Sequence, residues 1–179
     1  MKPSDLSASH LVIMLGIPGA GKSFFAENFA DTFQSPIISY DKLYKNLDDC
    51  EFDQKSKNMI ISHILKYMLE EISKTKRTII FDGRIYSRAS CAELIKVARK
   101  LKYEPLFVLV QTDALTARKR IIKAAHNNDK SVIPKEKFDK IVTQFNSMSK
   151  NIRNVVVISG KHTYQTQLKI VLKYLSESH

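Results

Sequence analysis

Residues 16–23, near the start of the chain, have the spacing of a phosphate-binding loop. They read GIPGAGKS, which matches the pattern G-x-x-x-x-G-K-[ST]. The glycines let the backbone wrap closely around phosphate groups, and the N–H groups of the loop and of the next helix point at those phosphates. In such a loop, Lys22 reaches the β- and γ-phosphates and the Ser23 hydroxyl binds Mg²⁺. We therefore predict a nucleoside triphosphate and Mg²⁺ as ligands, bound by Gly16, Pro18, Gly19, Ala20, Gly21, Lys22, Ser23 and Phe24.

A carboxylate follows the short apolar segment 36–39. Asp41 comes just after it, in the stretch Ile38-Ser39-Tyr40-Asp41. If the segment is a parallel strand, its end lies at the crevice where such sheets bind ligands. Asp41 would then bind the substrate and accept the proton of its hydroxyl as that hydroxyl attacks the γ-phosphorus. The alternative is that Asp41 is the N-cap of a helix over Lys42–Leu47.

A second carboxylate ends the segment 77–82, RTIIFD. Asp82 is placed as in a Walker-B element and could hold Mg²⁺ directly or through water. It could instead orient Lys22 or fix the turn at Gly83. Arg84 and Arg88 follow near the same crevice. They are candidates to bind an anionic acceptor, and the alternative is that they lie in the solvated start of a helix.

A basic segment later in the chain has the composition of a lid. Residues 113–126 contain Arg118, Lys119, Arg120 and Lys123, and a polar stretch over 127–131 precedes Pro134. A lid over about 118–134 would bring an arginine to the transferred phosphoryl group and help exclude water. Arg120 is the first candidate for this catalytic role and Arg118 the second. The alternative is an ordinary charged helix face.

The elements that must position these residues alternate along the chain. Strand segments are apolar throughout, as in parallel strands buried on both faces. Apolar residues recur at intervals of three to four in the segments between them, which predicts helices. The pattern indicates one α/β domain over 1–179, with helices on both faces of the sheet. The expected strands are 11–15, 36–39, 78–81, 106–110 and 155–158, and the expected helices are 23–33, 54–73, 87–101, 113–125, 135–148 and 166–175.

The charge of the chain favours anionic partners. It has 179 residues and a formal net charge of +11, and its pI is about 9.6. Such a balance suits nucleotides or nucleic acid, although a lysine-rich soluble surface explains it equally well. Cys50 and Cys91 form no disulfide framework or zinc motif, which suits a reducing cytosol. The apolar run 11–15 is too short for a membrane span, so we expect a cytoplasmic protein without a membrane partner.

Taken in order, these motifs resemble the polynucleotide-kinase and zeta-toxin-like P-loop kinases, over roughly residues 10–160. The segment from Val132 through Pro134 to Phe145 resembles the part that follows the lid in polynucleotide kinases and seryl-tRNA kinases. The stretch Ser39-Tyr40-Asp41 is also similar to seryl-tRNA kinases. The resemblance departs at Tyr44, where polynucleotide kinases have a phosphate-binding arginine, and at Asp82-Gly83-Arg84, where they tend to have Asp-x-Thr-Asn.

The resemblance implies a three-layer P-loop fold with a five-stranded parallel sheet of order 2-3-1-4-5 and a helical lid. It implies transfer of the γ-phosphate of ATP to a hydroxyl, with Asp41 as general base and Arg120 as lid arginine. By position, the loop that contains Lys161 would border the adenine. The preference for ATP over GTP comes from this resemblance.

Three functions remain open at this stage. A kinase acting on a nucleic-acid end is favoured by the net charge and by a set of basic residues on or near one predicted helix. A kinase acting on a sugar, nucleoside, antibiotic or nucleotide-sugar needs only a closed pocket. A regulatory protein that binds ATP without transferring phosphate would not need the base Asp41. The sequence does not determine the oligomeric state. The basic set comprises Arg84, Arg88, Lys96, Arg99, Lys100 and Lys102.

Overall fold

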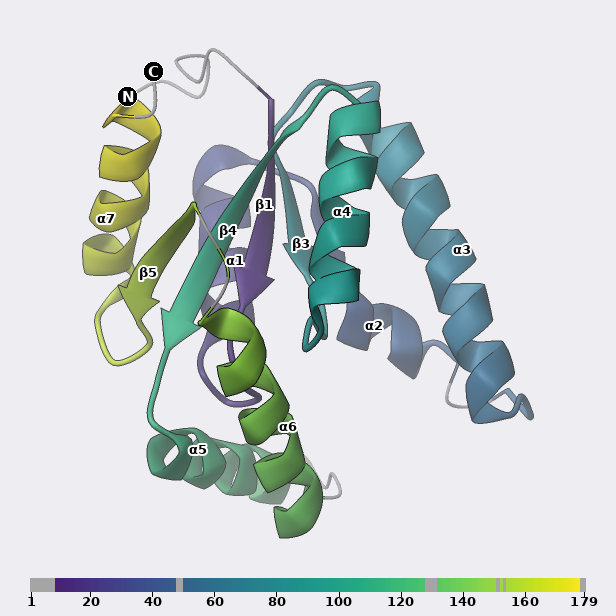
Figure 1. The fold of residues 1–179 in the computed structure, drawn as a ribbon, viewed down its shortest axis with the longest axis vertical. Coiled ribbons are helices and arrows are strands. Elements are labelled where there is room, and N and C mark those ends of the chain that lie inside the picture. The colour runs from purple at the N-terminus through teal and green to yellow at the C-terminus, as the bar shows by residue number, and fades with distance from the viewer. Residues whose placement is uncertain (1–8, 48–49, 128–131, 151, 153, 178–179) are drawn as a thin grey trace.

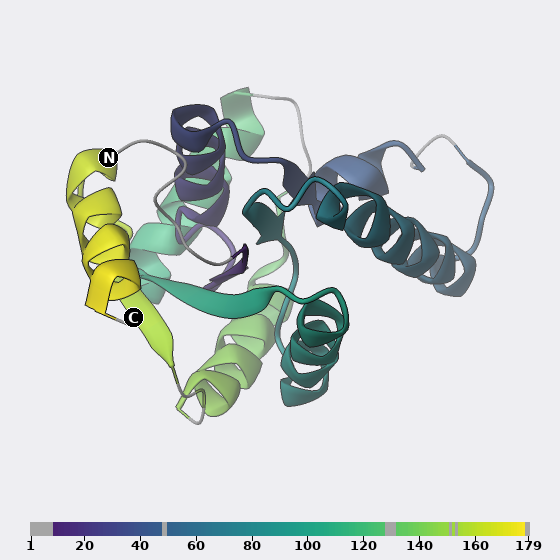
Figure 2. The ribbon, with the colours of Figure 1, turned by 90° about the horizontal axis from the view of Figure 1, so that it is seen from above.

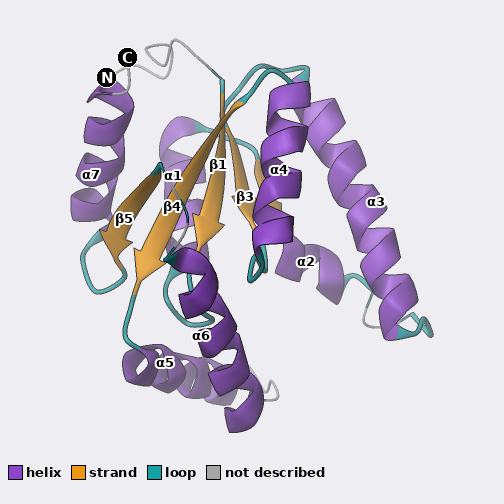
Figure 3. Ribbon diagram, in the orientation of Figure 1, coloured by secondary structure: helices purple, strands orange, loops and turns teal. Residues whose placement is uncertain are grey.

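The computed structural model describes residues 9–47, 50–127, 132–150, 152 and 154–177. Its centre is a sheet of five parallel strands in the order β2-β3-β1-β4-β5, all of which point the same way (Figure 3). This confirms the predicted α/β fold and the strand order 2-3-1-4-5. The strands are β1 (His10–Leu15), β2 (Ile37–Ser39), β3 (Ile79–Asp82), β4 (Glu104–Gln111) and β5 (Val155–Ser159).

Helices cover both faces of this sheet (Figures 1 and 2). The helices α1 and α7 pack against each other on one face, and α4 packs against β4 on the other face. Two further helices, α5 and α6, lie at the carboxyl ends of the strands, while α2 and α3 lie beside the β2–β3 half. The helices are α1 (Lys22–Phe33), α2 (Tyr40–Lys45), α3 (Gln54–Ser73), α4 (Arg88–Lys100), α5 (Ala114–Asn127), α6 (Lys135–Ser149) and α7 (Tyr164–Glu177).

The core explains why the strand sequences are apolar rather than alternating. Residues 11–15 of β1 are at most 1% exposed, because β1 lies between β3 and β4 and has helices on both faces. Helix α1 contributes Phe25 and Phe29 to one side of this core, and α6 contributes Phe138 and Phe145 near the carboxyl ends. Burying one such aromatic side chain contributes about 1.5–3 kcal/mol.

The parallel register brings the functional segments to one edge of the sheet. Ser39 pairs with Asp82 at the ends of β2 and β3, and Gln111 pairs with Ser159 at the ends of β4 and β5. The loop after β1 leaves the centre of this edge. The segments that the sequence singled out for chemistry, which follow β1, β2, β3, β4 and β5, therefore meet at the carboxyl edge.

The structure also describes the two cysteines and the apolar character of the helices. Both cysteines are free, Cys91 buried and Cys50 partly buried. In the part of the chain that the structure describes, no helix is both long and apolar enough to cross a membrane.

Candidate functional site

The loop after β1 is held in a conformation that needs glycine. Gly16, Gly19 and Gly21 have φ angles of 145°, 78° and 108°. A Cβ on Gly19 would collide with the carbonyl oxygen of Ala117, so α5 lies directly against the loop. Gly21 is also the N-cap of α1 and leaves the helix without a side-chain cap or an acidic residue in its first turn. The positive end of the helix dipole is therefore available to an anion.

Pro18, Ala20 and Phe24 differ in their positions around this loop. Pro18 lies within a turn closed by a hydrogen bond from the Ala20 N–H to the Ile17 carbonyl, 3.1 Å long. Ala20 is fully buried, and its carbonyl accepts hydrogen bonds from elsewhere in the fold. Phe24 is 53% exposed. Of these three residues, Pro18 and Ala20 belong to the turn, and Phe24 lies in the first turn of α1.

The ammonium group of Lys22 lies inside the loop. Its Nζ donates to the carbonyl oxygens of Gly16 at 2.9 Å and Ile17 at 3.1 Å. Burial lowers the pKa of Lys22, and the carboxylates of Asp82 and Asp41 act in the opposite direction. Both predicted acids are therefore close enough to Lys22 to act on its charge.

Ser23 and Asp82, the two residues predicted to bind Mg²⁺, are hydrogen-bonded to each other. The Ser23 hydroxyl donates a 2.6 Å hydrogen bond to Oδ2 of Asp82, whose residue is 8% exposed. Burial raises the pKa of Asp82, while the Ser23 hydroxyl and the Lys22 ammonium act against this rise. A hydroxyl and a carboxylate are the oxygen ligands that Mg²⁺ takes beside phosphates and waters, so this pair fits the ion. Among the described residues, no cluster of three or more His, Cys, Asp or Glu forms another metal site.

Asp41 is not a helix N-cap, so that alternative is wrong. Helix α2 begins at Tyr40, earlier than the expected Lys42, and Ser39 caps it by accepting the Lys42 N–H at 3.4 Å. Asp41 lies in the first turn of α2 with an exposed side chain. Its Oδ1 accepts a hydrogen bond of 2.7 Å from Nε of Arg84.

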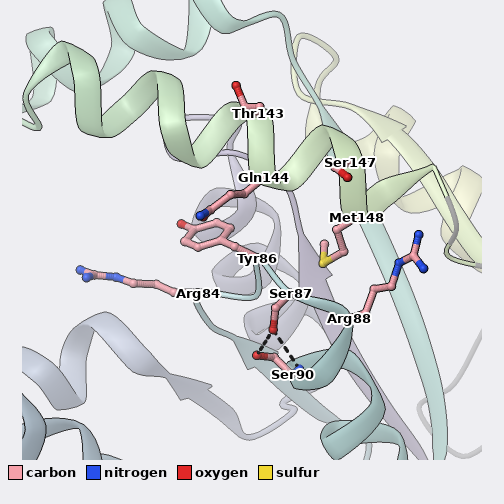
Figure 4. Close-up of a pocket in the computed structure, with 9 residues that line it drawn as sticks. All are labelled: Arg84, Tyr86, Ser87, Arg88, Ser90, Thr143, Gln144, Ser147 and Met148. Carbon is pink, nitrogen blue, oxygen red and sulfur yellow. Dashed lines mark hydrogen bonds between the residues drawn. The ribbon is translucent and has the colours of Figure 1, made fainter.

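Arg84 and Arg88 both line a cavity of about 630 Å³ between the β3–α4 loop and α6 (Figure 4). The two side chains point in opposite directions, so they lie at different ends of the cavity. The lining residues are Arg84, Tyr86, Ser87, Arg88, Ser90, Thr143, Gln144, Ser147 and Met148.

The other predicted basic residues are not part of this cavity. They lie near the C-terminal end of α4, whereas Arg88 is its first residue. A helix of 13 residues is about 20 Å long, so these charges are close to the opposite edge of the sheet. The set lies on or next to α4 as predicted, and only Arg84 and Arg88 of it line the cavity. The other residues of the set are Lys96, Arg99, Lys100 and Lys102.

The lid arginines hold elements of the fold together. Arg120 donates from Nη1 to the Ala20 carbonyl at 3.2 Å and from Nη2 to the Gly160 carbonyl at 2.8 Å. It thereby links the phosphate-binding loop to the loop after β5. The guanidinium of Arg118 lies 5.6 Å from the ring centre of Phe138 and links α5 to α6. Residues 128–131 of the predicted lid are outside the described part of the chain.

Lys161 also has a partner within the fold. Its Nζ lies 2.7 Å from Oδ2 of Asp113, whose Oδ1 accepts the Thr116 N–H at 2.8 Å at the start of α5. The hydrogen bond from Lys161 and those from Thr116 lower the pKa of Asp113. Thr112, directly after β4, also contacts the phosphate-binding loop: its hydroxyl donates to the Ala20 carbonyl at 2.9 Å. The loop expected to border the adenine is therefore fastened to α5 and the phosphate-binding loop.

Sequence reasoning missed several residues around Asp41 and the cavity. Tyr40 and Tyr44 stand four apart in one helix, which places both rings on one face, so their spacing was a usable signal. Nothing in the sequence indicated that Tyr86 and Gln144 would line the same cavity as Arg84, because this depends on how α6 packs over the β3–α4 loop.

The sheet order, the glycine-bearing loop and the Ser23–Asp82 pair define a P-loop nucleotide-binding protein. A family model described as an AAA domain matches residues 11–148, and the chain belongs to this family. No curated protein sequence matches the chain.

Solved structures share this fold with the chain. A protein from Chloroflexus aurantiacus J-10-fl, provisionally assigned as a kinase, matches with a TM-score of 0.73 and 11% identity, over 96% of this chain and 98% of that one. A chain of the Pnkp1/Rnl/Hen1 RNA repair complex matches with a TM-score of 0.73 and 18% identity, over 86% of this chain but 50% of that one. A gluconokinase from Sinorhizobium meliloti 1021 matches with a TM-score of 0.62 and 15% identity, over 94% and 92%.

Proposed function

We propose that this protein is a kinase that uses ATP and Mg²⁺ to phosphorylate a hydroxyl group. The observation that carries the proposal is the grouping of Lys22, the Ser23–Asp82 pair and Asp41 at one edge of the sheet. A protein that only bound the nucleotide would need Lys22, Ser23 and Asp82 but not the carboxylate of Asp41. Ser23 and Asp82 are the residues that would hold Mg²⁺, which would supply positive charge against the negative charge of the phosphates.

The residues of this chain have separable roles in such a reaction. The acceptor oxygen forms a bond to the γ-phosphorus, the bond from that phosphorus to the β–γ bridging oxygen breaks, and the hydroxyl proton passes to Asp41. Lys22 would leave the carbonyls of Gly16 and Ile17 to contact the phosphates. Ser23 and Asp82 would hold Mg²⁺. Arg120 would stabilise the transferred group by exchanging a carbonyl for a phosphate oxygen.

The acceptor we favour is a nucleic-acid end. The net charge of +11 and the two arginines of the cavity support it, as does the likeness to a chain of an RNA repair complex. The alternative is a small-molecule kinase. It is supported by the cavity of about 630 Å³, a size usual for small ligands, and by the likeness to a gluconokinase.

Transfer of labelled γ-phosphate from ATP tests the proposal. The acceptors would be 5′-hydroxyl RNA and DNA oligonucleotides, tRNA, nucleosides and sugars. Asp41→Asn should lower turnover by about 10²–10⁴-fold with little change in ATP affinity. Asp31→Asn, which removes an exposed carboxylate at the far end of α1, is the matched control and should behave as wild type.

Each result separates the candidates. Labelled oligonucleotide or tRNA, with binding that falls steeply as salt rises, would support the nucleic-acid acceptor. Label confined to a small molecule would support the alternative. If Lys22→Ala retained full transfer, the role of the loop in binding the phosphates would be wrong.

A further inference from the structure

The guanidinium of Arg84 is in contact with three residues of α2. Its Nε donates to Oδ1 of Asp41 at 2.7 Å, and its Cζ lies 5.5 Å from the ring centre of Tyr40 and 5.6 Å from that of Tyr44. The two rings are stacked on each other, with centres 6.2 Å apart and planes 21° from parallel. We call Tyr40, Asp41, Tyr44 and Arg84 the arginine cage.

Helix α3 holds the two rings of the arginine cage in place. The Tyr44 hydroxyl donates to Oε1 of Gln54 at 2.8 Å, and the Tyr40 hydroxyl donates to Oδ1 of Asn58 at 3.3 Å. Gln54 also donates to the same Asn58 oxygen at 3.0 Å. These bonds restrain the two rings in the empty protein, so less side-chain entropy is lost from the rings when a ligand binds beside them.

Arg84 also lines the cavity whose other end carries Arg88 (Figure 4). None of the nine described residues that line this cavity is acidic. The uncharged lining groups are hydroxyls, an amide and a thioether. The carboxylate of Asp41, which is not among the lining residues, is paired with Arg84. A cavity with this charge favours a ligand that carries negative charge near Arg84.

The ion pair between Arg84 and Asp41 is one that a phosphate can replace at little cost. Both side chains are more than half exposed, at 51% and 63%, and an ion pair in such a setting adds little stability. Arg84 donates to Asp41 through its Nε, and its guanidinium has further N–H donors on the two terminal nitrogens. A phosphate can engage two of these donors at once, which strengthens the contact beyond that of a single bond.

We propose that Arg84 binds a phosphate group carried by the acceptor, and that this contact releases Asp41 to act as the base. The inference rests on the proposed function and names its substrate class, a hydroxyl compound that already bears a phosphate. The phosphate can belong to a nucleic-acid strand or to a phosphorylated sugar. Tyr40 and Tyr44 stay against the guanidinium and keep it in place during the exchange.

A binding experiment tests this without relying on turnover. ADP and Mg²⁺ first fill the phosphate-binding loop of ¹⁵N-labelled protein, and inorganic phosphate is then added. The Nε–Hε resonance of Arg84, assigned by its loss in Arg84→Lys, reports directly on the bond to Asp41. We expect it to shift and saturate, and to do so equally in the control Lys42→Gln, which removes an exposed cation of α2 that is paired with Glu27. An Arg84 resonance that does not move, or a shift confined to Arg88, overturns the inference.

Two acceptors identify the source of the phosphate. The same resonance is followed with a 5′-hydroxyl oligonucleotide and with a hexose phosphate, and the compound that saturates it at lower concentration is the better ligand. Arg84→Gln should lower the affinity of the protein for that compound by about tenfold or more, because a charge-assisted contact is lost. The affinity for ATP should be unchanged. If neither compound binds more weakly to Arg84→Gln than to wild type, the inference is wrong.

Turnover then separates this inference from the proposed function. If the Arg84 resonance responds to phosphate but no acceptor is ever phosphorylated, the anion site stands and the kinase proposal fails. If neutral sugars or nucleosides are phosphorylated at the same rate by wild type and Arg84→Gln, the kinase proposal stands and the anion requirement fails.

Discussion

Gly19 gives a quantitative test of how closely α5 packs on the phosphate-binding loop. In Gly19→Ala, the new Cβ would lie against the carbonyl oxygen of Ala117 and 3.0 Å from both the carbonyl carbon of that residue and Cγ1 of Ile121. Ordinary contacts of a Cβ begin at 3.4 Å, so several atoms must move by a few tenths of an ångström or more. Two of these atoms are backbone, which cannot rotate away as a side-chain end can.

The expected cost has two parts. A non-glycine residue at positive φ costs about 1–2 kcal/mol, and forcing a methyl group into packed surroundings costs a further ~1–3 kcal/mol. Gly21→Ala is the matched control, because Gly21 also has positive φ but its Cβ would meet nothing closer than 3.8 Å. Gly19→Ala should therefore be less stable than Gly21→Ala by about 1–3 kcal/mol.

Urea unfolding of the empty protein measures this difference. For a chain of this size, 1 kcal/mol corresponds to about 2–4 °C in melting temperature, so thermal unfolding gives an independent check. Equal unfolding free energies for the two variants would refute the reasoning, because they would show that Ala117 does not press on the loop. The links from Arg120 to Ala20 and Gly160 would then also be in question, since they depend on the same placement of α5.

Two further variants test other parts of the structure. Burial raises the folded-state pKa of Asp82, so its contribution to stability is present below its unfolded pKa of about 3.9 and is lost as pH rises through the folded pKa. At pH 7 without Mg²⁺, Asp82→Asn should therefore unfold at a higher urea concentration than wild type. The difference in unfolding free energy between the two proteins should be smaller at pH 5. An Asp82→Asn protein less stable than wild type at pH 7 would contradict this. In Tyr103→Phe, the hydroxyl bond to the Arg77 carbonyl at 2.9 Å is lost, which should cost about 1 kcal/mol in urea unfolding with unchanged ATP binding. Unchanged stability would show that water replaces this bond.

Local features of the sequence were enough for most of the fold. The central strands β1 and β3 appear as unbroken apolar runs because they are buried on both faces, whereas Val157 of the equally apolar edge strand β5 is 45% exposed. The helix of residues 54–73 was predicted with the bounds that α3 has. The phosphate-binding loop was also predictable, because its turn and the following helix are formed by consecutive residues. The strand order came from the resemblance, since apolar runs alone do not say which strands are neighbours.

Side-chain partners within the site depended on contacts between distant segments. Arg84 and Asp41 are 43 positions apart, and Arg120 and Ala20 are 100 apart. The alternative in which Asp41 caps a helix was wrong, because Ser39 is the N-cap of α2; both residue types are good caps, and local preference does not decide between them.

The sequence by itself determined the fold class, the nucleotide loop and the two acids at the ends of neighbouring strands, because these follow from hydrophobic periodicity and local spacing. Only the tertiary structure decided that Arg84 lies near the rings of Tyr40 and Tyr44 and bonds to Asp41, and that Arg120 bridges two loops. The physical reason is that such contacts depend on sheet register and on the paths of loops, which bring distant residues within bonding distance.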